Sequence, residues 1–217
     1  MLPAAVAVAL SPIPIIGVIL VLGTPRARTS GPAFAVGWII GLTVVSVIVI
    51  NLTGSASDPY SATATGVNWI KVGLGVIFLA MAAQQWRKRP KEGQPTELPK
   101  WLAAVDEITP PKAFGLGVAL SAANPKNLAL TLAAAASIAQ AGTDVVDETI
   151  AVAIFVALGS VTVAGAVLAT FVAPERSKSA LASLREFMTD HSAVIMMVVL
   201  LVLGAKLIGD GLGGLGS

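Results

Sequence analysis

Two short clusters hold the residues of this sequence that are best suited to binding a polar or charged group. The first is the segment 11–14 (SPIP) in one apolar run, and the second is the segment 124–127 (NPKN) in another. Proline has no backbone N–H and leaves a carbonyl about one turn earlier without its helical partner. Each cluster therefore joins free backbone groups to polar side chains. The candidate binding residues are Pro12, Pro14, Asn124, Pro125, Lys126 and Asn127.

Lys126 brings a positive charge into the middle of an apolar run. Its neighbour Pro125 is about thirteen residues inside one end of the run. If the run is a helix that crosses a membrane, 1.5 Å per residue puts Pro125 about 20 Å deep in the hydrocarbon core of the bilayer, which is ~30 Å thick. A lysine near the bilayer centre costs about 2.5–3.5 kcal/mol and needs partners. The adjacent asparagines and the carbonyls freed by the prolines of segment 11–14 are candidates. Lys126 either meets an anionic group of a substrate or ties two broken helices together.

Three further charged residues are candidates for gating or coupling. Lys71 and Lys206 are about four or five residues inside the ends of their apolar runs. A lysine there either extends its amine to the interface or lines a cationic vestibule. Asp106 precedes the fourth run. No Asp or Glu occurs inside a run, so a proton or sodium pathway of buried carboxylates has no evident members.

The composition excludes several classes of protein. The absence of Cys and the single His exclude disulfides, thiol chemistry and a multi-histidine metal site. No nucleotide-binding loop, zinc motif or Ser-His-Asp set occurs, so we expect no enzyme activity and no cofactor, metal or nucleic acid. Hydrophobic residues make up 55% of the chain and charged residues 12%, about half the charged share of a soluble domain. These values predict an integral membrane protein.

Six apolar runs are long enough to cross a hydrocarbon core, which requires about 20 helical residues. They are Leu2–Gly23, Pro32–Leu52, Gly66–Trp86, Lys112–Gln140, Thr149–Val172 and Ser192–Gly209. The first, third and fifth connections hold most of the Lys and Arg residues, whereas the others hold mainly Asp. Since basic loops stay in the cytoplasm, we expect an all-α protein of six transmembrane helices in the cytoplasmic membrane, with both termini outside.

The runs divide into two halves of three on either side of a long polar connection. We predict one transmembrane domain composed of residues 1–86, a cytoplasmic linker 87–111, residues 112–209 and a flexible tail 210–217. Three spans per half make the halves opposite in orientation, and the first helix of each is broken. This is the pattern of two inverted three-helix repeats with a central site at broken helices 1 and 4. Prolines also kink membrane helices without any function, but the matched positions favour a site.

These features resemble the LysE exporter superfamily over nearly the whole chain. The six spans, the proline motif of the first and the Asn-Pro-Lys of the fourth carry the resemblance. The segments 100–106 (KWLAAVD) and 124–128 (NPKNL) are similar to its actinobacterial Gap/Sap branch, the glycolipid-addressing proteins. Amino-acid exporters of the superfamily usually have a Pro-Gly pair where this chain has Ser-Pro-Ile-Pro. That departure counts against amino-acid export.

The resemblance implies a translocase that moves an anionic or glycosylated lipid, such as a mycobacterial cell-envelope glycolipid, towards the cell surface. Two alternatives stay open. One is an exporter of amino acids or other small solutes, and the other is a scaffold that assists a larger lipid exporter without transporting. The expected partners are the lipid, the membrane, and either a second copy of the chain or that larger exporter.

Overall fold

The computed structural model describes residues 1–53, 62–87, 108–139, 141 and 143–215, and the regular elements in these residues are all helices. In chain order they are α1 (Leu2–Ala9), α2 (Pro12–Leu22), α3 (Ala27–Thr53), α4 (Ala62–Arg87), α5 (Pro110–Val118), the π-helical segment η2 (Ala119–Ala123), α6 (Pro125–Ala139), α7 (Val145–Val172) and α8 (Pro174–Leu215). The predicted all-α membrane class agrees with these long apolar helices.

Four of the helices, α3, α4, α7 and α8, are each long and apolar enough to cross a membrane. α1 and α2 are bent by 43° and together are long enough for a fifth span. The run predicted as Lys112–Gln140 is helical over most of its length, but η2 and Asn124 divide it into shorter pieces. The count of six spans therefore stays a prediction.

Both breaks have the local sequence that starts a helix. Ser11 precedes Pro12 at the start of α2. Asn124 precedes Pro125 at the start of α6, where its Oδ1 accepts a hydrogen bond from a backbone N–H two residues later. Proline suits the first helical position because its missing N–H has no partner there, and Ser and Asn are favoured as N-caps. The chain thus ends one helix and begins another inside both predicted spans.

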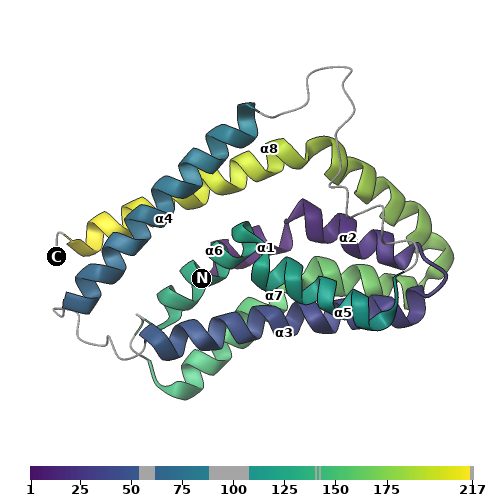
Figure 1. The fold of residues 1–217 in the computed structure, drawn as a ribbon, viewed down its shortest axis with the longest axis horizontal. Helices are drawn as coiled ribbons and strands as arrows, with labels where there is room; N and C mark the ends of the chain where they lie inside the picture. Colours follow the sequence, from purple (N-terminus) through teal and green to yellow (C-terminus); the bar gives the residue numbers. More distant parts are fainter. Residues whose placement is uncertain (54–61, 88–107, 140, 142, 216–217) are drawn as a thin grey trace.

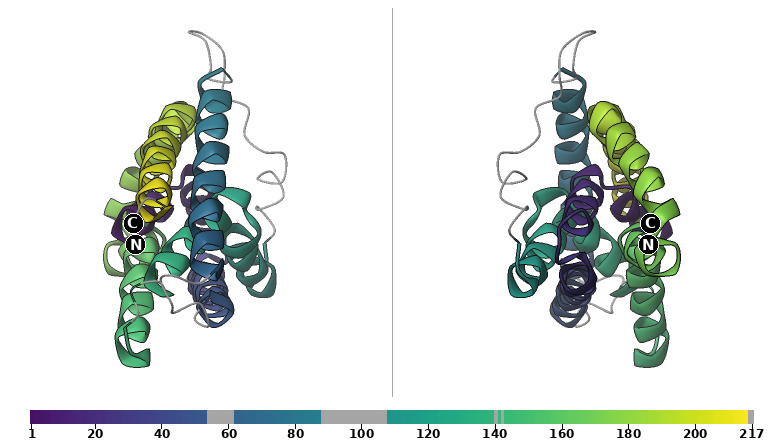
Figure 2. Two further views of the ribbon diagram at one scale, coloured as in Figure 1. Left: turned by 90° about the vertical axis from the view of Figure 1, so that its left-hand side faces the viewer. Right: turned by 90° about the vertical axis from the view of Figure 1, so that its right-hand side faces the viewer.

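Most of the helices are arranged in three groups (Figure 1). α4 and α8 lie side by side across the upper part of that view, while α3, α5 and α7 lie together below them. α1 and α6 pack against each other between these groups, which brings the two breaks together. Figure 2, in which the molecule is seen from its two ends, shows the α4–α8 pair on the side opposite to α3 and α7.

The contact between α3 and α5 depends on glycine. A Cβ atom on Gly117 would lie 2.2 Å from the carbonyl oxygen of Phe34, and one on Gly37 would lie 2.2 Å from that of Phe114. The helices therefore meet through reciprocal glycine positions, which allow the close backbone approach common in membrane helices. This contact holds α5, and with it the first part of the second broken run, against α3.

Polar side chains are turned inward and many large apolar side chains outward. Lys126, Asn127 and Ser121 are buried, whereas Ile48 of α3 is 52% exposed and Val161 of α7 is 59% exposed. A soluble monomer rarely exposes so much contiguous apolar surface, while lipid solvates it readily. The distribution agrees with a protein whose helices face a bilayer.

The last helix differs from its prediction. The sequence predicts a connection before Ser192 and a tail from residue 210, but α8 runs from Pro174 to Leu215 and curves around one end of the molecule (Figure 1). Its first part is amphipathic, with Leu181, Leu184 and Met188 packed on the core at helical spacing. At its other end, Gly214 O accepts a hydrogen bond of 2.8 Å from Asn68 Nδ2 of α4. Tertiary contacts thus extend both ends of the predicted span.

Candidate functional site

Lys126 lies where the break in the first run meets the break in the fourth. Its side chain is 4% exposed. The Nζ atom donates hydrogen bonds to Ser11 Oγ at 3.0 Å and to the carbonyl oxygen of Ala7 at 3.3 Å. The Ser11 hydroxyl in turn donates to Asn127 Oδ1 at 2.6 Å. One network therefore joins α1, the start of α2 and the start of α6.

The break between α1 and α2 supplies free carbonyls to this region. Ser11 N donates to Val8 O and not to Ala7 O, the acceptor of a regular α-helix, so Ala7 O is left for side chains. The carbonyl of Ala9 accepts a hydrogen bond of 2.7 Å from Thr162 Oγ1 of α7. Two carbonyl groups freed by the break are thus satisfied by side chains of two other helices, as burial requires.

The second break is closed by its own asparagines. Asn127 is fully buried, and its Nδ2 donates to the carbonyl of Leu120 in η2 at 2.9 Å. Asn124 caps α6 by accepting from Lys126 N at 3.1 Å. A π-helical turn shifts the hydrogen-bond ladder by one residue, and such turns occur often at functional sites. Here the shift leaves a carbonyl for Asn127, which holds the start of α6 in place.

The centre of the network holds a basic group, the Lys126 amine. Among the described residues Lys126 makes no ion pair, and the acceptors of its Nζ are uncharged. The N-terminal ends of α2 and α6 meet at the same place, and each adds a partial positive charge. A buried cation that lacks a counter-ion is costly. The arrangement is therefore suited to receive an anionic group.

The predicted site residues are partly brought together. Lys126 and Asn127 contact the first break directly, through Ser11 and Ala7. Pro12 and Pro14 are buried in the first turn of α2, and Pro125 is exposed at the start of α6. The prolines and Asn124 thus shape the helix ends, and Asn124 bonds to the backbone N–H of Lys126 rather than to its amine. Their role in binding stays a prediction.

Two residues that form hydrogen bonds at the breaks were not among the predicted binding residues. Ser11 was signalled by its place before Pro12, because a serine there is a good N-cap. Thr162 had no signal in the sequence, since a threonine in an apolar helix usually bonds to its own backbone. Its partner, Ala9 O, is 153 residues away in the chain.

The predicted gating residues form a separate group. Lys206 and Asp210 of α8 make an ion pair, and Lys71 of α4 is within electrostatic range of both. The pair borders a cavity of only about 30 Å³, whose walls include Ala4 of α1 and Leu130 of α6. These lysines are thus not part of the Lys126 network. Asp106 lies outside the described residues.

A groove of about 770 Å³ runs between α3 and α7. Its lining extends along α7 from Val145 to Ala164, a length of about 28 Å. Glu148 lines it near the start of α7, and most of the remaining wall is apolar. Ser160 also lines it, with a buried hydroxyl that has no hydrogen-bond partner among the described residues. Since Thr162 bonds to the first break, the groove extends to the level of that break.

A family model described as Sap, the sulfolipid-1-addressing protein, matches residues 1–213. No curated protein and no solved structure matches the chain. The matched region includes both proline breaks, Lys126 and nearly all of α8. Because the match covers almost the whole sequence, the chain belongs to the family of Sap, the sulfolipid-1-addressing protein.

Proposed function

We propose that this protein is a translocase that moves an anionic glycolipid, or its precursor, across the cytoplasmic membrane towards the cell surface. The observation that carries the proposal is the buried Lys126 amine, whose partners within the described part of the chain are uncharged, at the place where the two broken helices meet. Membership of a family named for addressing a sulfolipid supports lipid as the cargo.

The head group is the part of the lipid that Lys126 would receive. Ser11 and Ala7 satisfy hydrogen bonds of the amine but leave its charge uncompensated. A sulfate or phosphate would neutralise that charge and would face the N-terminal ends of α2 and α6. Since Lys126 is 4% exposed, α1 and α6 must separate to admit the head group.

The groove between α3 and α7 supports lipid over a small solute. It is long, mostly apolar, and ends near the first break. Acyl chains can occupy such a groove while the head group is bound at the breaks. An exporter of amino acids needs an aqueous cavity closed to lipid, so the apolar wall counts against that alternative.

The packing supports two inverted repeats. If Pro110–Ala139 is taken as the fourth of six spans, each span contacts its counterpart: the first meets the fourth through α1 and α6, α3 meets α7, and α4 meets α8. Exchange of the two halves also relates the contact of α3 with α5 to that of α7 with α1, and the contact of α3 with α6 to that of α7 with α2. Rocking of one half against the other would expose Lys126 to each side in turn.

Lipid mass spectrometry of a deletion strain tests the proposal in cells. The wild-type chain should restore an anionic glycolipid to the cell surface, whereas Lys126→Met should leave it in the inner membrane. Methionine keeps the length of the side chain but removes the charge. Lys112→Met, at an exposed lysine of α5, is the matched control and should restore the surface pool.

Two outcomes contradict the proposal. An unchanged surface pool in the deletion strain rules out the function, and full restoration by Lys126→Met rules out the site. The scaffold alternative predicts the same lipid pools in cells but no transport by the purified protein. The expected partner, either a second copy of the chain or a larger exporter, stays a separate prediction.

A further inference from the structure

A second cavity, of about 480 Å³, lies among the end of α2, the start of α3, the end of α7 and the start of α8. Its wall includes the apolar side chains of Ile19, Leu22 and Leu181. Its basic lining residues are Arg28, Lys178 and Arg185. These residues belong to connections that the distribution of charge assigns to the cytoplasm.

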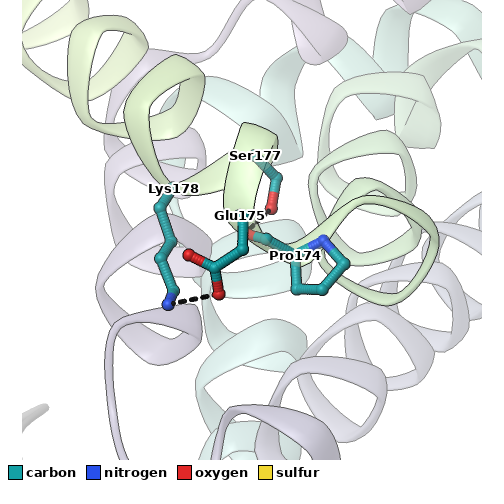
Figure 3. Close-up of polar contacts among 4 residues, drawn as sticks. All are labelled: Pro174, Glu175, Ser177 and Lys178. Carbon is teal, nitrogen blue, oxygen red and sulfur yellow. Dashed lines mark hydrogen bonds and ion pairs between the residues drawn. The ribbon is translucent and has the colours of Figure 1, made fainter.

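The charges at this cavity are open to a ligand. Lys178 Nζ is 3.0 Å from Glu175 Oε1, and both side chains are more than 70% exposed (Figure 3). Such an exposed pair contributes little free energy, so a stronger anion can displace the carboxylate. In the part of the chain that the structure describes, Arg28 and Arg185 make no ion pair.

The cavity lies close to the groove between α3 and α7. Residues of α3 and α7 line both this cavity and the groove of about 770 Å³. The lining of the groove reaches Ala164, and the cavity, called the cationic cavity below, includes Thr170 on the same helix. Six residues of a helix span about 9 Å. A lipid that leaves the cationic cavity along α7 therefore approaches the level of the breaks within a short distance.

We propose that this cavity is a loading site that binds the anionic head group of a lipid from the cytoplasmic leaflet before translocation. The basic side chains neutralise the head group, and the apolar wall accepts the first part of the acyl chains. A free inorganic anion would use the basic side chains alone. The inference rests on the proposed function for its place in transport, but binding is measured independently of transport.

Two neighbouring arginines allow a specific binding site to be distinguished from a surface that is positive throughout. Arg26 and Arg176 are exposed, lie two residues from Arg28 and Lys178, and do not line the cavity. If the basic residues serve only to orient the protein in the membrane, all of these positions are equivalent. If the cavity binds lipid, only the lining positions affect affinity.

Native mass spectrometry and calorimetry of the purified full chain with dioctanoyl phosphatidic acid test the proposal. The double variant Arg28→Gln/Arg185→Gln should bind about tenfold more weakly, since each charge-assisted contact is lost. The control Arg26→Gln/Arg176→Gln should stay within about twofold of wild type. Glu175→Gln should bind about two- to fivefold more tightly, because it frees Lys178. Loss of fold cannot produce a gain of affinity.

The outcomes distinguish this inference from the proposed function. Equal binding by the lining and control double variants overturns the loading site, as does equal affinity for dioctanoyl phosphatidylcholine or for inorganic sulfate. Lys126→Met should bind the lipid normally, since Lys126 does not line this cavity. Normal transport by Lys126→Met would overturn the central site and leave the loading site standing. Loss of binding by Lys126→Met would overturn the separation of the two sites.

Discussion

The groups that hold the Lys126 amine, in the residues that the structure describes, are all uncharged, and this determines what the residue can do. If its partner were a carboxylate, the amine would form a structural ion pair without net charge. Ser11 and Ala7 instead fix its position and leave its charge available. Both interpretations of Lys126 from the sequence are therefore compatible with the structure. The amine joins the two broken helices, and it can offer a positive charge where they meet.

Ser11→Ala removes the hydroxyl that links Lys126 to Asn127. The change leaves a buried amine and a buried amide each short of one partner, which costs about 1–3 kcal/mol. Thermal unfolding in detergent should show a clear loss of stability. Ser183→Ala, at an exposed serine of α8, should change stability by less than about 0.5 kcal/mol. Equal melting temperatures for the two variants would contradict the network.

Ser11→Asp tests whether the free charge matters. Aspartate is a good N-cap, so α2 should still start at the same position, and the new carboxylate should pair with Lys126. We expect a folded protein whose transport of an anionic lipid falls at least about tenfold, because the amine is neutralised. Ser11→Asn has a similar size without the charge and should keep more of the activity. Similar transport by the Asp and Asn variants would show that the charge of Lys126 is not used.

At the scale of the element, glycine positions decide how the broken runs are held. Gly117→Ala places a methyl group against the backbone of α3, and overpacking of this kind costs about 1–3 kcal/mol. The methyl group of Gly115→Ala, on the same helix, would meet no described atom within 4 Å apart from the nearby backbone of its own helix. Unfolding by a denaturing detergent should therefore separate the two variants. A destabilisation of Gly115→Ala as large as that of Gly117→Ala would contradict the described packing.

The breaks themselves were predictable, because Ser-Pro and Asn-Pro are local signals for the start of a helix. The pairing of Lys126 with Ser11 was not, since it depends on how α1 packs on α6. The amphipathic start of α8 was missed because its polar face lowers the mean hydropathy, although its apolar residues recur at helical spacing. The contacts of Thr162 and Gly214 join distant segments and leave no local pattern.

For the whole molecule, the orientation of each half is open to direct measurement because the chain has no Cys. Single cysteines at Lys112 and Asp144 would lie at the start of the fourth predicted run and just after its end. If that run crosses the membrane, a membrane-impermeant thiol reagent applied to intact cells should label Asp144→Cys and not Lys112→Cys. Ser179→Cys in α8 should also be protected from outside.

Labelling of both Lys112→Cys and Asp144→Cys from the same side would show that the run enters and leaves the same face. The two halves would then not be inverted, and alternating exposure of Lys126 by rocking would lose its basis. Permeabilised cells provide the control, because all three cysteines should react there.

Transport by the purified protein tests the central claim most directly. Proteoliposomes that contain the wild-type chain should move a fluorescent anionic glycolipid between leaflets, measured by its protection from a membrane-impermeant quencher. Vesicles with Lys112→Met should do the same. Vesicles with Lys126→Met, folded by the same unfolding assay, should show only the rate of protein-free vesicles. Movement at the wild-type rate by Lys126→Met, or none by the folded wild-type protein, would contradict a translocase built on this lysine.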